Sequence, residues 1–450
     1  MLPILNKEYT VTITAQGTNG EGITHIDDYT IFIPDTISGD EIITKITKLN
    51  KSYGFGKLIK IITPSPDRVI PPCPDFYKCG GCQIMHMSYN AQCIFKAQLV
   101  HDALLRIGGI ECDVKFNPAP SPERYRNKMV FPFSTDGNWG FYSARTHNVV
   151  QLEDCLLGDN LNKDILNCVR DFYKKEKLPF YNEEKHTGIL RRVFTRVSAK
   201  TGEMMVVISQ NCKTIPHRER LIFNLRQISD RITSVILNIN DKKTNLVLGD
   251  KNITIYGKDT LEDDLLGYSY EISPHSFFQI NHAQTEKLYE KALEFADIKE
   301  TSVVYDLYCG IGTISLSAAK YARKVIGIEI VPDAIKNANE NAKRNNITNA
   351  EFYCGAAEDI APKLLKQGDS PEVVILDPPR KGSDEKTLSA IINASPERIV
   401  YVSCNPATLA RDVKYLSENG YELTKAEAFD LFPNTTHVES VVLLSLSTEI

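Results

Sequence analysis

Residues 303–313 read VVYDLYCGIGT, an apolar run that ends in a glycine-rich turn. The run has the length and residue types of a buried strand. Gly310 and Gly312 let a ligand approach the backbone at the turn, and a helix starting near residue 313 would offer that ligand free N–H groups. This order of strand, turn and helix predicts an open α/β sheet with a binding site at the carboxyl ends of its strands.

The flanking sequence continues the same alternation of strands and helices. Apolar spacing predicts helices at 282–296, 313–321, 332–345, 384–392 and 406–418. Short β-branched runs predict strands at 302–307, 324–329, 351–354, 373–377, 398–403, 421–427 and 438–445. Residues 266–450 are therefore expected to form a doubly wound, Rossmann-like α/β domain.

The glycine-rich turn narrows the ligand class. Ser315 stands where a pyrophosphate-binding loop usually has its third glycine, which makes a dinucleotide less favoured. Glu329 ends the next predicted strand, about 20 residues after the turn, where a carboxylate can bind ribose hydroxyls. A strand with Asp306, the two glycines, a helix, and a strand ending in Glu329 is the order expected for S-adenosylmethionine in a class I methyltransferase.

Two further strand ends bring polar groups to the same edge of the sheet. Residues 373–382 read VVILDPPRKG, and residues 399–406 read IVYVSCNP. Asp-Pro-Pro resembles the motif of amino-methyltransferases, which usually place an aromatic residue after the prolines. Arg380 stands there instead, and Cys404 follows on the next strand end, so different chemistry is expected.

A cysteine in this place is suited to methylation of a pyrimidine carbon. Carbon 5 of uracil becomes nucleophilic when a thiolate adds to carbon 6, and a base must later remove the proton from carbon 5. Cys404 is the candidate nucleophile. Glu439, in the run THVE at residues 436–439, is the candidate base. A buried, inert cysteine is the alternative for Cys404.

The catalytic half resembles the RNA uracil-C5-methyltransferase family. The matching segments, in family order, are FFQIN at 277–281, DLYCGIG at 306–312, DPPR at 377–380, SCNP at 403–406 and HVE at 437–439. The resemblance implies that Gln279, Tyr308, Glu329 and Asp377 hold the methyl donor or the target base. It also implies Cys404 as nucleophile and Glu439 as base.

The resemblance further implies an RNA substrate. Phe277 is a candidate for stacking on an unstacked base, with core packing as the alternative. The N-terminal barrel and the cysteine cluster, described below, favour 23S ribosomal RNA, because family members that act on transfer RNA generally lack both. Transfer RNA, an amino-methyltransferase reaction and a non-catalytic RNA-binding assembly factor are the alternatives.

A cysteine-rich segment lies in a loop rich in proline and glycine. Cys73, Cys79 and Cys82 are close in sequence, which indicates a metal or iron–sulfur site in a reducing compartment. A zinc site with His86 as the fourth ligand is one interpretation. The family resemblance extends to CGGCQ at 79–83 and implies Cys155 as the fourth ligand of a 4Fe–4S cluster, with a structural role.

The sequence before the α/β domain divides into two parts. Residues 1–65 show four or five short alternating strands, which predict an OB-like barrel, and they resemble a TRAM RNA-binding domain. Residues 70–265 are expected to form a central, cluster-bearing α+β domain after a proline-rich break. Within it, a helix over 91–110 ends near Gly108 and Gly109, and family architecture implies that it packs on the catalytic domain.

Basic residues of the central segment are candidates for contact with RNA phosphates. They interleave with Tyr125 or follow one another in a strand, and they are Arg124, Arg126, Lys128, Arg191 and Arg192. Ordinary surface arginines are the alternative interpretation.

The overall composition sets outer limits. At about 150 residues per domain, 450 residues predict roughly three domains. Eleven cysteines are too few for a disulfide scaffold. Neither a signal peptide nor a membrane span is expected, so we expect a cytoplasmic protein. We also expect it to be a monomer. The net charge of −5 argues against RNA, since nucleic-acid-binding domains are usually basic.

Overall fold

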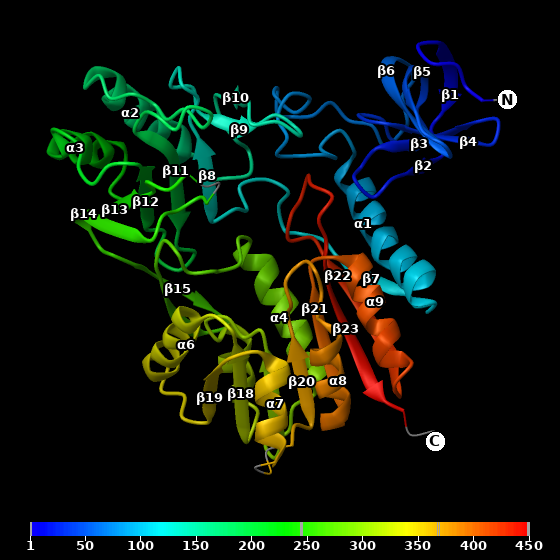
Figure 1. Ribbon diagram of the computed structural model, residues 1–450, viewed down its shortest axis with the longest axis vertical. Helices are drawn as coiled ribbons and strands as arrows, with labels where there is room; N and C mark the ends of the chain where they lie inside the picture. Colours follow the sequence, from blue (N-terminus) through cyan, green and yellow to red (C-terminus); the bar gives the residue numbers. More distant parts are fainter. Residues whose placement is uncertain (1, 244–245, 367, 369, 448–450) are drawn as a thin grey trace.

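The computed structural model describes residues 2–243, 246–366, 368 and 370–447. An N-terminal barrel and a central α+β body lie at one end of the molecule, and the α/β domain lies at the other (Figure 1). Among the described helices, none is long and apolar enough to cross a membrane.

The N-terminal barrel is a six-stranded sheet with the order β1-β5-β6-β4-β3-β2. Alternate isoleucines point inward, and Ile31, Ile33, Ile42 and Ile46 form its core. The sequence predicted four or five strands here, and the structure has six: β1 (Glu8–Thr12), β2 (Ala15–Gln16), β3 (Gly22–Ile26), β4 (Tyr29–Ile33), β5 (Glu41–Leu49) and β6 (Tyr53–Thr63).

The central body is built on a five-stranded sheet with the order β14-β13-β12-β11-β8. Its strands are β8 (Lys128–Pro132), β11 (Leu190–Val197), β12 (Met204–Gln210), β13 (Ile232–Ile239) and β14 (Lys251–Gly257). Helices α2 (Leu161–Lys175) and α3 (Arg218–Ile228) pack apolar residues on this sheet. Two hairpins flank it: β9 (Gly140–Tyr142) with β10 (Val149–Gln151), and β15 (Leu261–Leu265) with β16 (Tyr268–Ile272).

The catalytic domain has the predicted doubly wound sheet, with the order β19-β18-β17-β20-β21-β23-β22-β7. Strands β17 to β21 are parallel, and β23 runs antiparallel to β21 and β22. The strands are β17 (Val303–Leu307), β18 (Lys324–Glu329), β19 (Ala350–Cys354), β20 (Val373–Leu376), β21 (Arg398–Ser403), β22 (Tyr421–Phe429) and β23 (Glu439–Leu446).

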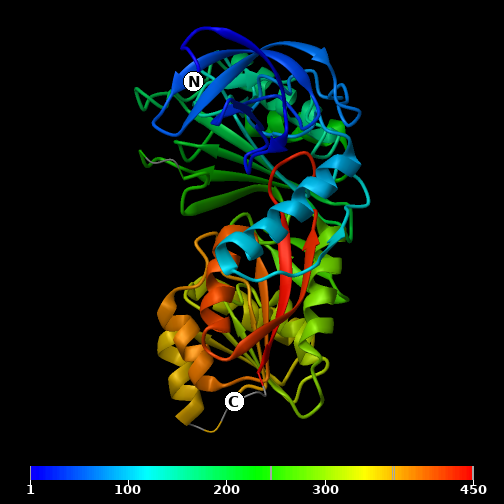
Figure 2. The same cartoon turned by 90° about the vertical axis from the view of Figure 1, so that its right-hand side faces the viewer.

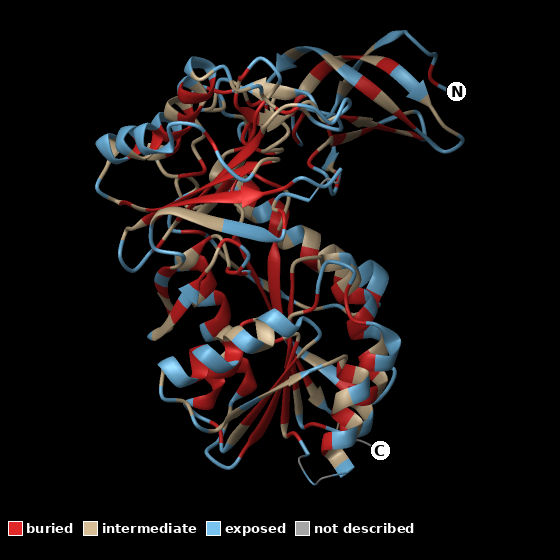
Figure 3. Ribbon diagram, turned by 60° about the vertical axis from the view of Figure 1, so that its left-hand side comes forward, coloured by how far each residue is buried: buried red, intermediate tan, exposed pale blue. Residues whose placement is uncertain are grey.

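Alternate residues of each strand face two different cores. Along β17, Val303, Tyr305 and Leu307 pack on one face, and Val304 packs on the other. The first face is covered by α7 (Ala357–Lys366), α8 (Glu385–Ala394) and α9 (Pro406–Ser417), and the second by α4 (His282–Ala296), α5 (Thr313–Ala319) and α6 (Pro332–Arg344). Figure 2 shows the orange helices and the green helix α4 on opposite sides of the sheet. In Figure 3, the strands between them are buried and the outer helix faces are exposed.

One strand corrects the expected domain boundary. Residues 114–117, assigned from sequence to the central domain, form β7 (Val114–Asn117) and pair in parallel with β22 at the edge of the catalytic sheet. The helix before it, α1 (Tyr89–Ala103), continues into a π-helical turn that ends at Gly109, and its Val100 packs in the catalytic core. Backbone pairing of β7 and apolar packing of α1 thus join residues 89–117 to the α/β domain.

Candidate active site

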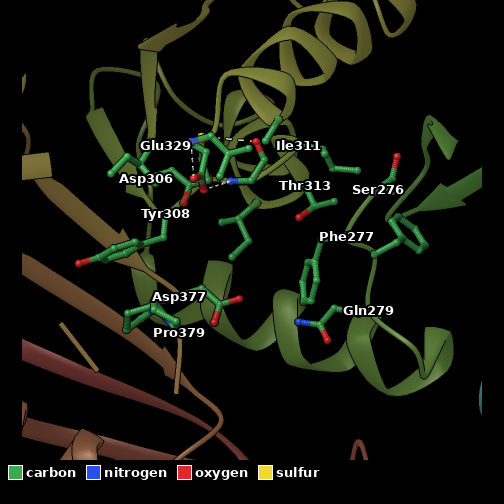
Figure 4. Close-up of a pocket in the computed structure, with 18 of the residues that line it drawn as sticks. Ser276, Phe277, Gln279, Asp306, Tyr308, Ile311, Thr313, Glu329, Asp377 and Pro379 are labelled. Carbon is green, nitrogen blue, oxygen red and sulfur yellow. Dashed lines mark hydrogen bonds between the residues drawn. The ribbon is translucent and has the colours of Figure 1, made fainter. Parts of the chain in front are cut away.

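A cavity of about 1260 Å³ opens where the parallel strands end. Each strand end contributes one polar side chain to its wall: Asp306 from β17, Glu329 from β18, Asp377 after β20 and Cys404 after β21. Glu439, the first residue of β23, lines the same cavity. Figure 4 shows Asp306, Tyr308 and Glu329 on one side and Phe277 and Gln279 on the other.

The glycine-rich turn is fixed by Glu329. One carboxylate oxygen accepts a hydrogen bond from the Gly310 N–H at 3.3 Å, and the other accepts one from the Val331 N–H at 2.9 Å. Gly310 and Gly312 have φ of 56° and 86°, in the left-handed region that favours glycine. The structure therefore brings the two predicted glycines and Glu329 together at one end of the cavity.

Ser315 explains the missing third glycine. Its hydroxyl donates a hydrogen bond of 2.5 Å to the Asp306 carboxylate, which is fully buried at the end of β17. Burial raises the pKa of Asp306 to about 7. The serine thus stabilises a buried carboxyl beneath the turn, at the position where a dinucleotide-binding loop has a glycine for close packing.

The expected reacting groups meet at the other end of the cavity. Burial raises the pKa of the Cys404 thiol to about 11, and the charges of Glu439 and Asp377 add to this effect while Arg380 opposes it. Burial also raises the pKa of Asp377 to about 7 and that of Glu439 well above its usual range. Burial in this pocket therefore disfavours the charged form of each of the three acids.

His437 lies in this pocket and was not singled out from the sequence. Arg380 donates a hydrogen bond of 3.3 Å to its Nε2, and its ring meets Phe432 edge to face. Burial and the nearby Arg380 charge lower its pKa to about 4, so the neutral ring accepts from the guanidinium. Its place in the HVE motif, two residues before Glu439, was the available signal.

The segment before α4 forms one wall. Phe277 is 68% exposed and lines the cavity, so the alternative of core packing is wrong. Asn127 of the central body holds this segment, because its backbone and side-chain N–H groups donate to the carbonyls of Ile280 and Gln279. Tyr308, with φ of 66°, bonds through its hydroxyl to Ser383 at 3.0 Å.

Two of the proposed phosphate contacts are corrected. Arg191 and Arg192 are only 6% and 7% exposed, because they lie on β11 inside the central body. Arg191 donates to the Asn240 side chain and to two nearby carbonyls, and Arg192 donates to the Leu246 carbonyl and to Glu183. These side chains fasten loops of the protein and are not a surface for RNA.

The other three basic candidates have different environments. Arg124 is paired with Asp154 at 2.5 Å and donates to the carbonyls of Cys155 and Gly158, so it stabilises the Cys155 loop. Arg126 lies over the Tyr125 ring at 5.8 Å. Lys128 lines the cavity, and burial with two neighbouring arginines lowers its pKa to about 8. Of the five, Lys128 alone reaches the cavity.

The four candidate cluster cysteines gather in one place. Burial raises the pKa of Cys82, and the neighbouring Cys155, Cys79 and Cys73 add to this effect. Burial also raises the pKa of Cys155, with smaller contributions from Cys79 and Cys73. The Gly81 N–H donates to the Cys79 sulfur at 3.3 Å. Within the described ranges, however, no three His, Cys, Asp or Glu side chains are arranged tightly enough to hold a metal ion.

His86 does not join these cysteines. It is completely buried, its ring packs on Phe76 at 5.3 Å, and the charged groups that act on it are Arg68 and Asp40. Burial lowers its pKa to about 4. The structure therefore gives no support to the zinc alternative with His86 as fourth ligand.

Comparison with known proteins identifies the family. The family described as tRNA (Uracil-5-)-methyltransferase matches residues 197–447, more than half of the chain. The chain belongs to this family. It is an S-adenosylmethionine-dependent RNA methyltransferase, as the motifs predicted. A TRAM domain matches residues 5–59, which confirms the predicted nature of the N-terminal barrel.

Relatives of this uracil-5-methyltransferase match over nearly their full length. An uncharacterized RNA methyltransferase of Clostridium tetani is 45% identical, covering 98% of this chain and 96% of the relative. One of Clostridium acetobutylicum is 43% identical, covering 98% and 97%. The crystal structure of Pyrococcus abyssi tRNA (uracil-54, C5)-methyltransferase with S-adenosyl-L-homocysteine has a TM-score of 0.79 and 29% identity, covering 97% and 100%.

Proposed function

We propose that this protein transfers a methyl group from S-adenosylmethionine to carbon 5 of a uridine in 23S ribosomal RNA, through a covalent adduct with Cys404. The observation that carries the chemistry is the shared cavity. It joins the Glu329-bound glycine turn, suited to a methyl donor, to Cys404, Asp377 and Glu439, suited to activation of a pyrimidine. Such a pocket needs a target base drawn out of its stack.

The proposed reaction divides between Cys404 and Glu439. The Cys404 thiolate adds to carbon 6 of uracil, and the electron pair of the 5,6 double bond moves into an enolate with carbon 5 as its nucleophile. S-adenosylmethionine supplies the electrophilic methyl group when bound. The Glu439 carboxylate then takes the proton from carbon 5, the double bond re-forms, and the carbon–sulfur bond breaks to return the thiolate.

The remaining wall residues orient the reactants in this proposal. Asp377, with a pKa near 7, can hydrogen-bond the polar edge of the base either as donor or as acceptor. Phe277 offers an exposed ring for stacking. The Asn405 side-chain amide donates a hydrogen bond of 3.0 Å to the Arg380 carbonyl and so positions Arg380. The positive charge of Arg380 favours the Cys404 thiolate.

Removing the Glu329 carboxylate is expected to weaken the methyl-donor site. Glu329→Ala loses both the ribose contact and the acceptor for the Gly310 N–H. Loss of charge-assisted hydrogen bonds of this kind costs about 1.5–3 kcal/mol, or roughly a 10- to 100-fold rise in the Kd for S-adenosylmethionine. Isothermal titration calorimetry measures it. Glu340→Ala, an exposed glutamate on α6, is the matched control, and an unchanged Kd in Glu329→Ala would contradict the assignment.

The substrate assignment is tested by product mapping. Purified protein, S-adenosylmethionine and either unmodified 23S ribosomal RNA or unmodified transfer RNA are incubated, and modified nucleosides are identified and located by mass spectrometry. The proposal expects 5-methyluridine at a defined position of 23S ribosomal RNA. Methylation of transfer RNA alone would overturn the substrate, and methylation of an exocyclic nitrogen would overturn the chemistry.

Transfer RNA is the second candidate substrate. The observation that favours it is the likeness to the Pyrococcus abyssi tRNA (uracil-54, C5)-methyltransferase, which covers 97% of this chain. With that coverage, the accessory N-terminal region does not separate the two classes of RNA. Support for 23S ribosomal RNA rests on the family resemblance of the cysteine motif.

We also propose that Cys73, Cys79, Cys82 and Cys155 hold a 4Fe–4S cluster. Four cysteines close enough to raise one another's pKa form the donor set that such a cluster requires. Burial raises the pKa of each of these thiols, and coordination to iron would deprotonate them. Because Cys155 belongs to the central body and the other three to the loop before α1, the cluster would fasten one to the other.

Anaerobically purified protein is therefore expected to be brown, with broad absorption near 400 nm and about four irons per chain. Cys82→Ser should lower the iron content and the absorption together. Cys212→Ser, a partly buried cysteine elsewhere in the central body, is the control. Stoichiometric zinc, or iron that survives in Cys82→Ser, would contradict the cluster assignment.

A further inference from the structure

The loop that leads to the proposed base is held by parts of the chain outside the catalytic sheet. Residues 430–438, named here the base loop, connect β22 to β23, and β23 begins with Glu439. The loop carries His437 and is mostly buried. Figures 1 and 2 both show this red loop reaching away from the sheet to the beginning of α1 and the segment before it.

The first anchor is a buried ion pair. Lys96 of α1 donates to the Asp430 carboxylate at 2.6 Å and to the Phe432 carbonyl at 3.0 Å. Both charged side chains are completely buried. Tyr89, two helical turns earlier, donates its hydroxyl to the other Asp430 oxygen at 3.0 Å. A buried charge pair tolerates little displacement, so α1 fixes the start of the base loop.

The second anchor is a reciprocal pair of hydrogen bonds between Gln92 and Asn434. The Gln92 amide donates to the Asn434 side-chain oxygen at 3.2 Å, and the Asn434 backbone N–H donates to the Gln92 side-chain oxygen at 2.9 Å. Gln92 is 2% exposed and Asn434 is 5% exposed. Asn434 has φ of 68°, a conformation that asparagine tolerates better than most residues.

The cysteine segment and the central body reach the same residue. The backbone N–H groups of Gln83 and Ile84, directly after Cys82, donate to the Asn434 carbonyl at 3.0 and 3.2 Å. The Asn434 side chain donates to the Pro122 carbonyl at 2.9 Å. Tyr125 adds a bond from its hydroxyl to the Pro433 carbonyl at 3.1 Å. Three separate segments therefore converge on one turn of the base loop.

The turn is connected to the reacting groups through its neighbours. The Thr435 hydroxyl donates to the Phe432 carbonyl at 2.8 Å and accepts from the His437 N–H at 3.3 Å. The Phe432 and His437 rings meet edge to face, and Arg380 bonds to His437. A shift of the turn at Asn434 would therefore pass along the loop toward Glu439.

We propose that Gln92 and Asn434 are positioning residues that set the placement of Glu439 for removal of the proton from carbon 5. This inference rests on the proposed role of Glu439 as base. The affected step is the breakdown of the methylated adduct. Glu439 takes the carbon-5 proton, the C–H electron pair forms the double bond, and the carbon 6–sulfur bond breaks to return the Cys404 thiolate. Thiolate addition and methyl transfer use groups on other elements.

The signature is accumulation of a covalent protein–RNA adduct. Displacement of a catalytic group by about 1 Å can cost about 100-fold in rate. Gln92→Ala is therefore expected to lower kcat about 10- to 100-fold, with little change in the KM for RNA. Because the adduct forms normally and resolves slowly, an SDS-stable species carrying the transferred methyl group should build up. A merely structural loss would lower activity without this species.

The experiment uses the full-length protein, unmodified substrate RNA and S-adenosylmethionine with a tritiated methyl group. The reaction is quenched in SDS during steady state. Asn434→Gly is the second variant, because it removes the side-chain bonds yet allows the positive φ. Gln98→Ala is the matched control, since this exposed glutamine on α1 bonds within its own helix. The inference expects adduct in Gln92→Ala and Asn434→Gly and none in Gln98→Ala.

Glu439→Gln separates the two hypotheses. The positioning variants are first shown to be folded by thermal melting. If Glu439→Gln then accumulates adduct and these variants do not, the inference is wrong and the proposed base stands. If Gln92→Ala does not fold, Asn434→Gly decides. If Glu439→Gln itself forms no adduct, the base assignment fails and the inference fails with it.

Discussion

Replacing Cys404 by alanine is expected to abolish methylation while leaving RNA binding near its wild-type level. In the proposed mechanism the thiolate provides the covalent bond that makes carbon 5 nucleophilic, and no other described cysteine lines the same end of the cavity. Loss of a covalent nucleophile should lower kcat by at least about 10³-fold. The substitution leaves the TRAM barrel, the central body and the other pocket walls in place, so RNA binding should be retained.

The measurement combines methyl incorporation with trapping by RNA that contains 5-fluorouridine. Fluorine replaces the carbon-5 hydrogen, so no proton can be removed and the adduct persists. Wild-type protein and Cys354→Ala, an exposed cysteine on β19, should both form an SDS-stable complex, and Cys404→Ala should form none. Residual methylation in Cys404→Ala would show that the mechanism is wrong.

The same thiol gives the reaction a defined pH dependence. Burial and the neighbouring carboxyl groups raise the pKa of Cys404 to about 11, and the active form is the thiolate. Below that pKa, kcat/KM should therefore increase with pH, by about tenfold per unit while thiolate formation limits the rate. Neutralising Arg380 removes a charge that favours the thiolate, and should shift the rise to higher pH.

The grouping of the candidate site residues could be predicted from the sequence because of one property of parallel sheets. Their strands end at a common edge, so Asp306, Glu329, Asp377 and Cys404, each at a predicted strand end, had to meet. Apolar runs of four to six residues between helical segments marked those ends reliably. Glu439 lies at the opposite end of its strand, but β23 is antiparallel, and this reversal brings it to the same edge.

Features that depend on distant partners could not be predicted. Arg191 and Arg192 look like surface cations in a strand, and what buries them is a loop about 50 residues later, at Asn240 and Leu246. The edge strand β7 was too short and irregular in pattern to be recognised, and its partner β22 lies some 310 residues away. Local periodicity contains no information about such pairings.

The contacts of the base loop show the same limit at the functional site. Lys96 and Gln92 lie in a helix with ordinary apolar spacing, and each bonds to a residue more than 330 positions away. Helical propensity alone would have placed both on a solvent-exposed face, since lysine and glutamine are seldom buried. Their burial is understandable only because Asp430 and Asn434 provide a matching charge and a matching amide.

Glu439→Gln should separate methyl transfer from product release. Glu439 is fully buried, and burial together with Asp377 raises its pKa well above the usual range, so its carboxylate is a stronger base than an exposed one. Glutamine has nearly the same shape as glutamate, so thiolate addition and methyl transfer, which use other groups in the proposed mechanism, should proceed. Glutamine cannot accept the carbon-5 proton, so the methylated adduct should persist.

The expected result is a burst of about one methyl group per protein chain, followed by turnover reduced about 10²- to 10⁴-fold, the range for loss of a general base. Tritiated methyl groups should remain with the protein on a denaturing gel. After ribonuclease digestion of the RNA, the labelled nucleotide should still be bound to the protein. Glu427→Gln, on the neighbouring strand β22, is the matched control, because glutamine can still accept the hydrogen bond from Asn117 there. A Glu439→Gln protein that binds RNA and S-adenosylmethionine but gives no burst would place Glu439 before methyl transfer, in activation of Cys404, and would contradict its role as the base for carbon 5.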